Sequence, residues 1–141
     1  MGSLDLTSLK KAIGSLKKAV EIAQAKIFGN QASQDEIELL KAGVIQNFEF
    51  TYELCWKYMK RWIANNIGAE IVDGVTRREL FRLSRENRLL VDVEQWMDFH
   101  YARNHSAHTY NKAMADEVYG VVLKFVAAAE DFLEKLEERN A

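Results

Sequence analysis

The stretch from Arg103 to Tyr110 carries an unusual density of polar, chemically active side chains. Its eight residues hold an arginine, two histidines, an asparagine, two hydroxyls and a phenol, and only Ala107 is purely apolar. A buried core disfavours this composition, because each buried polar group needs a partner or costs about 1–3 kcal/mol. The composition favours a site for phosphate or nucleotide. The alternative is a polar helix junction whose side chains cap one another.

The spacing of Arg103 and His108 decides what this stretch could do. On a continuous helix, residues five apart lie on different faces, so the two side chains converge only through the arginine's length or a local bend. If they converge, they suit RNA phosphodiester chemistry without a metal. A histidine that titrates near neutrality can accept the proton of a ribose 2′-OH or protonate a leaving oxygen. An arginine can hold the phosphate and stabilise the charge that develops on it.

Amphipathic helices are predicted on either side of this stretch. The chain has no proline, so long helices are permitted. Apolar residues step by four and three in the first segment, from Leu9 to Ile27, and in the last, from Val118 to Leu136. We expect Asp5 or Thr7 to cap the first helix and Gly29-Asn30 to end it.

The longest predicted helix begins with a capping box, Ser33 followed by Glu36, and continues to about Ile67-Gly68. Apolar and aromatic side chains occupy more than one of its faces. Such a helix is central in the fold or lies at an oligomer interface. Aromatic residues at helical spacing also favour a packed core over a cofactor-binding element.

Two glutamates on this helix, Glu49 and Glu53, are one turn apart and repel each other mildly. Lys57, one turn further on, can relieve one of them. The pair does not predict a metal site, because no Glu-x-x-His sequence occurs in the chain. We therefore expect no metal and no cofactor.

Two further capping signals precede the polar stretch. Thr76 followed by Glu79 predicts a short helix, and Asp92 followed by Gln95 predicts another that runs into the polar stretch. The polar residues that follow are weak helix formers, so we expect a bend, a break or a frayed end between about Ser106 and Ala115.

The short helix and its surroundings form the most basic part of the chain. One interpretation is a solvated face paired to nearby glutamates, and the other is a local patch that binds phosphate or a partner. The five arginines concerned are Arg77, Arg78, Arg82, Arg85 and Arg88.

These patterns together predict an all-α fold, an antiparallel up-and-down four-helix bundle with an additional short helix, in a single domain over residues 1–141. The net charge of −2 excludes a global basic field, so any nucleic-acid contact must come from a local patch. A single cysteine, Cys55, allows no intramolecular disulfide. No apolar run approaches the roughly 20 residues that span a bilayer. We expect a cytoplasmic protein with no membrane contact.

Two motifs resemble those of a known family. The sequence Arg103-x4-His108-x-Tyr110 resembles the Arg-x4-His-x-Tyr motif of HEPN-domain proteins, which are small helical bundles. The segment from Phe48 to Lys57 resembles, more narrowly, the nucleotidyltransferase substrate-binding-protein branch of that superfamily. The resemblance extends from Leu6 to about Leu136 and includes Asn104, which completes the first motif.

The resemblance implies a homodimer that associates with a minimal nucleotidyltransferase encoded nearby. In the related HEPN/MNT toxin–antitoxin modules, the HEPN protein is a ribonuclease that uses the motif arginine and histidine, which match Arg103 and His108 here. Its partner silences it by transferring AMP to the motif tyrosine, which matches Tyr110. Asn104 and Tyr110 are thus the residues expected to contact nucleotide.

Three functions remain open at this point. The chain is a helical partner subunit of a minimal nucleotidyltransferase, or a metal-independent HEPN ribonuclease toxin inactivated by AMPylation of Tyr110, or a structural helical adaptor. Because the long second helix is apolar on several faces, we expect a homodimer. Its twofold axis would bring two polar stretches to one cleft, where RNA or nucleotide would bind.

Overall fold

The computed structural model describes residues 3–108 and 111–140 of the chain, and within these residues all regular secondary structure is helical. The α-helices are α1 (Thr7–Phe28), α2 (Gln34–Asn66), α3 (Arg77–Glu86), α4 (Val93–His105) and α5 (Lys112–Arg139). Two short 3-10 helices, η1 (Ala69–Ile71) and η2 (Ser106–His108), lie between them. No described helix is long and apolar enough to cross a membrane.

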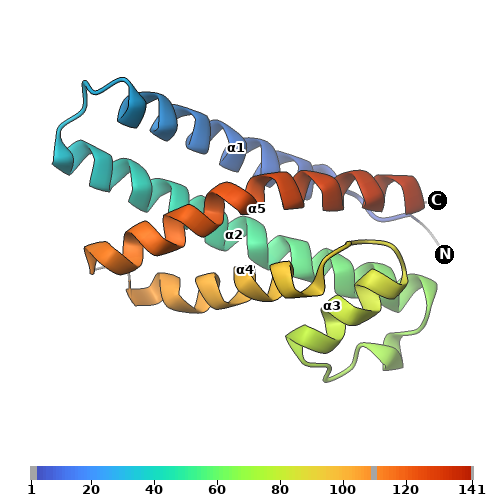
Figure 1. Cartoon of the computed structure of the whole chain (residues 1–141). Helices are drawn as coiled ribbons and strands as arrows, with labels where there is room; N and C mark the ends of the chain where they lie inside the picture. Colours follow the sequence, from blue (N-terminus) through green and yellow to red (C-terminus); the bar gives the residue numbers. More distant parts are fainter. Residues whose placement is uncertain (1–2, 109–110, 141) are drawn as a thin grey trace.

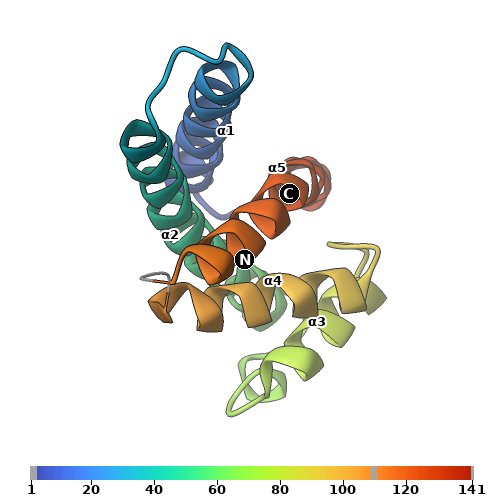
Figure 2. The same cartoon turned by 60° about the vertical axis from the view of Figure 1, so that its left-hand side comes forward.

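Four long helices alternate in direction and form the bundle (Figure 1), so the predicted all-α up-and-down architecture is confirmed. Helices α1 and α2 form one antiparallel pair, and α4 and α5 form the other. The short α3 lies outside the four, beside the start of α4 (Figure 2).

Aromatic side chains from three helices fill the centre of the bundle. Phe125 of α5 contacts the rings of Phe48 and Tyr52 from α2 and of Trp96 and Phe99 from α4. All five side chains are buried. The aromatic series of the second helix is therefore largely core, as its periodicity indicated, and it fixes the distance between α2 and α4.

Local signals place most helix ends where the sequence predicted them. The Ser33–Glu36 capping box forms in both directions, with N–H donors 3.2 and 3.0 Å from the side-chain oxygens. Thr76 and Asp92 likewise accept hydrogen bonds at the starts of α3 and α4. The expected cap of α1 was one residue off. Leu6 is the N-cap, and the Asp5 carboxylate accepts from the first helical N–H at 2.9 Å.

The predicted break in the polar stretch is confirmed. Helix α4 ends at His105, one 3-10 turn follows, and α5 begins only at Lys112. Asn111 then caps α5, because its side-chain oxygen accepts from the N–H groups of Ala113 and Met114. The break leaves the last turn of α4 facing the middle of α2.

Candidate functional site

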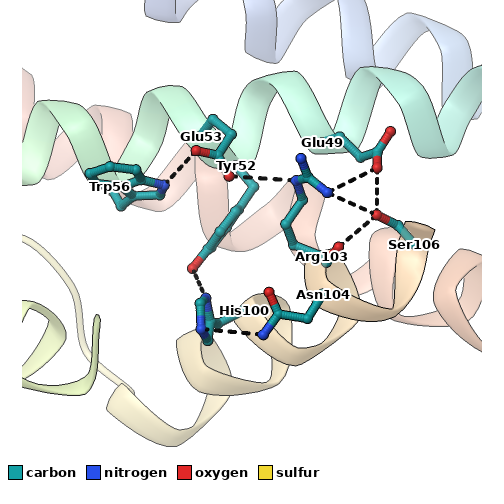
Figure 3. Close-up of polar contacts among 8 residues, drawn as sticks. All are labelled: Glu49, Tyr52, Glu53, Trp56, His100, Arg103, Asn104 and Ser106. Atoms are coloured by element: carbon teal, nitrogen blue, oxygen red, sulfur yellow. Dashed lines mark hydrogen bonds and ion pairs between the residues drawn. The ribbon is translucent and has the colours of Figure 1, made fainter. Parts of the chain in front are cut away.

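Arg103 is the centre of a polar cluster between α4 and α2 (Figure 3). Its Nη1 lies 3.1 Å from Glu49 Oε2, and its Nε lies 3.5 Å from Glu53 Oε1. The side chain of Arg103 is 33% exposed, so water still reaches the pairs and weakens them. The motif arginine is thus held by two carboxylates at the rim of the bundle, with part of its guanidinium open to solvent.

Ser106 closes the cluster from the other side. It is buried, and its hydroxyl donates to Glu49 and lies 2.7 Å from the Arg103 carbonyl oxygen. Arg103 Nη1 also lies 3.3 Å from this hydroxyl. The turn after α4 therefore helps to fix the arginine that the last turn of α4 presents.

This arrangement corrects the expectation for the two glutamates. Lys57 was expected to relieve their repulsion, but its Nζ lies over the Trp56 ring at 5.7 Å. Relief comes instead from Arg103, fifty or more residues away in the sequence. The i,i+4 pairing rule considers only residues on the same helix. It therefore could not predict that the partner of the glutamates is an arginine on another helix. The unbalanced glutamate pair was the signal that could have indicated it.

A histidine that the motif does not contain lies beside Arg103. His100 is one turn earlier on the same face of α4, and its Nδ1 lies 2.9 Å from the hydroxyl of Tyr52 (Figure 3). Burial raises the pKa of Tyr52 well above its ordinary value, so this phenol stays protonated and can donate. Burial and the nearby charge of Arg77 lower the pKa of His100, while Glu53 opposes them. The ring is therefore held mainly neutral at pH 7.

The other motif residues lie further out. Asn104 is exposed, with Nδ2 3.5 Å from Nε2 of His100. His108 is exposed at the end of η2, and within the described chain no hydrogen bond or ion pair joins it to Arg103. Tyr110 lies outside the described residues. The structure thus brings Arg103 and Asn104 together with His100.

The arginine-rich segment is a solvated face paired to glutamates in part. Arg78 pairs with Glu94, and Arg82 lies 3.7 Å from Glu79, as a solvated face would. Arg77 differs, because its guanidinium carbon lies 3.5 Å from the centre of the Trp56 ring. Arg77 therefore faces the same side of α2 as the cluster around Arg103. Among residues 3–108 and 111–140, no group of three His, Cys, Asp or Glu side chains is placed to hold a metal.

The lowered pKa of His100 predicts a pH dependence of folding. The unfolded chain takes up this proton near the usual pKa of 6.5, before the folded chain does. The stability contributed by neutral His100 is thus complete above about pH 6.5 and is lost as pH falls through the lower, folded pKa. Melting temperatures of wild type and His100→Gln between pH 5 and 8 check this. The wild type should lose stability relative to the variant on acidification, and parallel curves would contradict it.

Comparisons with known proteins agree with this architecture. A family model described as "Nucleotidyltransferase substrate binding protein like" matches residues 4–138. The chain belongs to this family. The resemblance seen in the Phe48–Lys57 segment and in the motif around Arg103 is confirmed at the level of the family.

The chain is also similar to one named protein and to two solved structures. A Haemophilus influenzae protein named probable ribonuclease HepT is 32% identical over 139 residues, covering 97% of this chain and 94% of that protein. A solved H. influenzae structure, described as revealing the fold of a substrate binding domain of a nucleotidyltransferase, aligns with a TM-score of 0.89 at 28% identity, covering 94% of this chain and 99% of that one. A Thermus thermophilus crystal structure aligns with a TM-score of 0.70 at 26% identity, covering 91% and 98%.

Proposed function

We propose that this chain is the helical partner subunit of a minimal nucleotidyltransferase, within a toxin–antitoxin-like pair of proteins. The observation that carries the proposal is the match to the substrate-binding family over nearly the whole chain, residues 4–138. The site geometry supports it. The cluster around Arg103 is open at the bundle rim, and its arginine is occupied by Glu49 and Glu53 in the isolated chain. A site of this kind would be completed by a second protein that binds at the bundle rim.

Co-expression with the nucleotidyltransferase encoded beside this chain tests the proposal. An affinity tag on the transferase should recover this chain through extended washing in moderate salt, because a specific interface survives conditions that screen surface charges. An unrelated nucleotidyltransferase carrying the same tag serves as the control. Equal recovery by both baits, or by neither, would count against the partnership.

The exposed face of α2 supports homodimerisation next to this site. Phe50 is 62% exposed and Leu39 is 75% exposed, and the two lie three turns apart on one face of the helix. Phe50 follows directly after Glu49, so an isologous contact through this face would bring two Arg103 clusters toward one cleft. RNA or nucleotide would bind there.

A Phe50→Lys substitution should therefore shift the protein from dimer to monomer, because two lysines would face each other across the twofold axis. Sedimentation velocity at micromolar concentration measures this. Phe28→Lys is the matched control, since Phe28 is 79% exposed at the far end of α1. A monomeric wild type, or an equal effect of both substitutions, would overturn the dimer.

The second candidate function is a metal-independent ribonuclease in which Arg103 holds the phosphate and His108 transfers the proton. The identity of 32% with a protein named probable ribonuclease HepT favours it. In this candidate, the nucleotidyltransferase silences the site by transferring AMP from ATP to the Tyr110 hydroxyl with release of pyrophosphate, and Asn104 contacts the nucleotide. The added phosphate would pair with Arg103 and occupy the space of an RNA phosphate.

Intact-mass and peptide-mass measurements after co-expression with the transferase test the Tyr110 step. We expect the mass of one AMP on the peptide that contains Tyr110, and no increase in Tyr110→Phe. A phenol has a pKa of about 10, so the transferase must supply the base and metal ions for this reaction. An unmodified Tyr110 beside a transferase that is active on another substrate would exclude the step.

A further inference from the structure

Two buried arginine nitrogens lie on the side of α2 that faces α3 and α4. In the described part of the chain, Nε of Arg77 and Nε of Arg103 are the buried side-chain atoms without a hydrogen-bond partner. Arg103 has carboxylates beside it, whereas Arg77 forms no ion pair with any described residue. Buried donors in folded proteins are nearly always satisfied. Arg77 therefore has a buried donor for which the described residues supply no acceptor.

The position of Arg77 is fixed by its neighbours. Its guanidinium stacks on Trp56, and the Trp56 indole N–H donates to Glu53 at 3.0 Å, which holds the ring in place. Arg77 is also the first residue of α3, where unpaired backbone N–H groups add partial positive charge. A stacked guanidinium at a helix start is well oriented to bind an anion.

His100 and Asn104 offer further donors toward the same region. Arg77 stacks on the Trp56 ring, and His100 contacts the hydroxyl of Tyr52, one turn before Trp56 on α2, so both groups lie on the same side of that helix. When the Tyr52 hydroxyl donates to Nδ1 of His100, the proton of the neutral ring is on Nε2. In this tautomer, the Nε2–H group of His100 and the Asn104 amide N–H are both donors, and their nitrogens are 3.5 Å apart. An anionic oxygen would accept from both.

We propose that Arg77, His100 and Asn104 form a phosphate-binding site beside the Arg103 cluster. The site takes the phosphate group of a mononucleotide or of an RNA strand. This inference rests on the proposed function for the source of the phosphate, and it extends that function by assigning Arg77 and His100, which lie outside the Arg103-x4-His108-x-Tyr110 motif, alongside Asn104. The charged and titratable groups that face His100 from other helices are Tyr52 and Glu53 of α2 and Arg77 of α3, and Arg103 lies one turn further along α4 itself.

Histidine NMR spectra of the full chain test the site directly, because the chain has only three histidines, His100, His105 and His108. AMP is the first probe, and adenosine is its control without phosphate. A 2′-O-methyl oligoribonucleotide is the second probe, because it carries phosphates but no 2′-OH that could be cleaved. We expect the ring signals of His100 to move with a phosphate-bearing probe and to stay in place with adenosine.

Substitutions identify the residues that bind. Arg77→Gln should weaken binding by at least about tenfold, the effect of losing a hydrogen bond to a charged group. Arg85→Gln, on the same helix, is the matched control and should leave binding unchanged. Asn104 is exposed, so Asn104→Ala removes one donor without disturbing the core, and it should weaken binding by several-fold. Circular dichroism verifies that each variant is folded.

Each outcome decides one point. A shift with AMP alone identifies a mononucleotide site, and a shift with the oligonucleotide alone identifies an RNA site. A silent His100 with both probes, an equal shift with adenosine, or undiminished binding by Arg77→Gln and Asn104→Ala would overturn the inference. None of these results depends on recovery of a nucleotidyltransferase complex, so failure of the site and failure of the partnership are distinguishable.

Discussion

An Arg103→Ala variant should lose ribonuclease activity by about 10²–10³-fold, if the wild type cleaves RNA, because a donor aimed at developing phosphate charge has an effect of that size. The substitution also leaves Glu49 and Glu53 without their counter-charge, which adds repulsion at the same place. Cleavage of tRNA by the purified chain, and growth on expression without the nucleotidyltransferase, measure the loss.

Two further variants, Arg103→Lys and Arg82→Ala, show whether the loss of activity is specific to the guanidinium of Arg103. Lysine keeps the charge but cannot contact two carboxylates through a planar fork, so Arg103→Lys should restore only part of the activity. Arg82 pairs with Glu79 on an exposed face, and its removal should change nothing. If Arg103→Ala alters stability and no activity, the structural adaptor is favoured. If wild-type expression is harmless and tRNA stays intact, the ribonuclease candidate is lost and the partner subunit remains.

A Phe125→Ala variant should lower the free energy of unfolding by about 3–5 kcal/mol, the range for truncating a buried phenylalanine. Phe125 is fully buried and contacts aromatic rings from α2 and α4, so its loss leaves a cavity where both site-bearing helices meet. The Arg103 cluster should loosen together with the core, because α2 and α4 carry opposite halves of it.

Urea denaturation measures this effect. Phe28→Ala is the matched control, since the same truncation at a position 79% exposed should change stability by no more than about 0.5 kcal/mol. The dependence of the unfolding free energy on urea concentration should be the same for wild type and variant. This result would show that the substitution changes stability and not the surface exposed on unfolding. A loss below about 1 kcal/mol for Phe125→Ala would mean that this ring does not organise the core.

The helices were predictable because their signals are local. A capping residue and the N–H groups it satisfies lie within three positions, as at Ser33 and Thr76. The break after His105 follows from a run of weak helix formers. The start of α1 shows the limit of such signals, because Asp5, one position before the N-cap Leu6, satisfies the N–H of Thr7.

The site was less predictable, because its contacts join distant parts of the chain. Tyr52 meets His100, and Glu49 meets Arg103, only after α2 and α4 pack through their aromatic residues. The motif drew attention to Arg103 and His108. It gave no weight to His100, although His100 precedes Arg103 by three residues and shares its helix face. Faces of predicted helices are therefore a better guide to such a site than motif spacing alone.

The measurement that tests the central claim most directly is light scattering of this chain, of the nucleotidyltransferase proposed as its partner, and of their mixture during size-exclusion chromatography. A partner subunit predicts a new peak whose mass is an integer combination of the two chains and which persists at micromolar concentration. The two proteins eluting separately, each at the mass it has alone, would contradict the claim that this chain is a subunit of a nucleotidyltransferase.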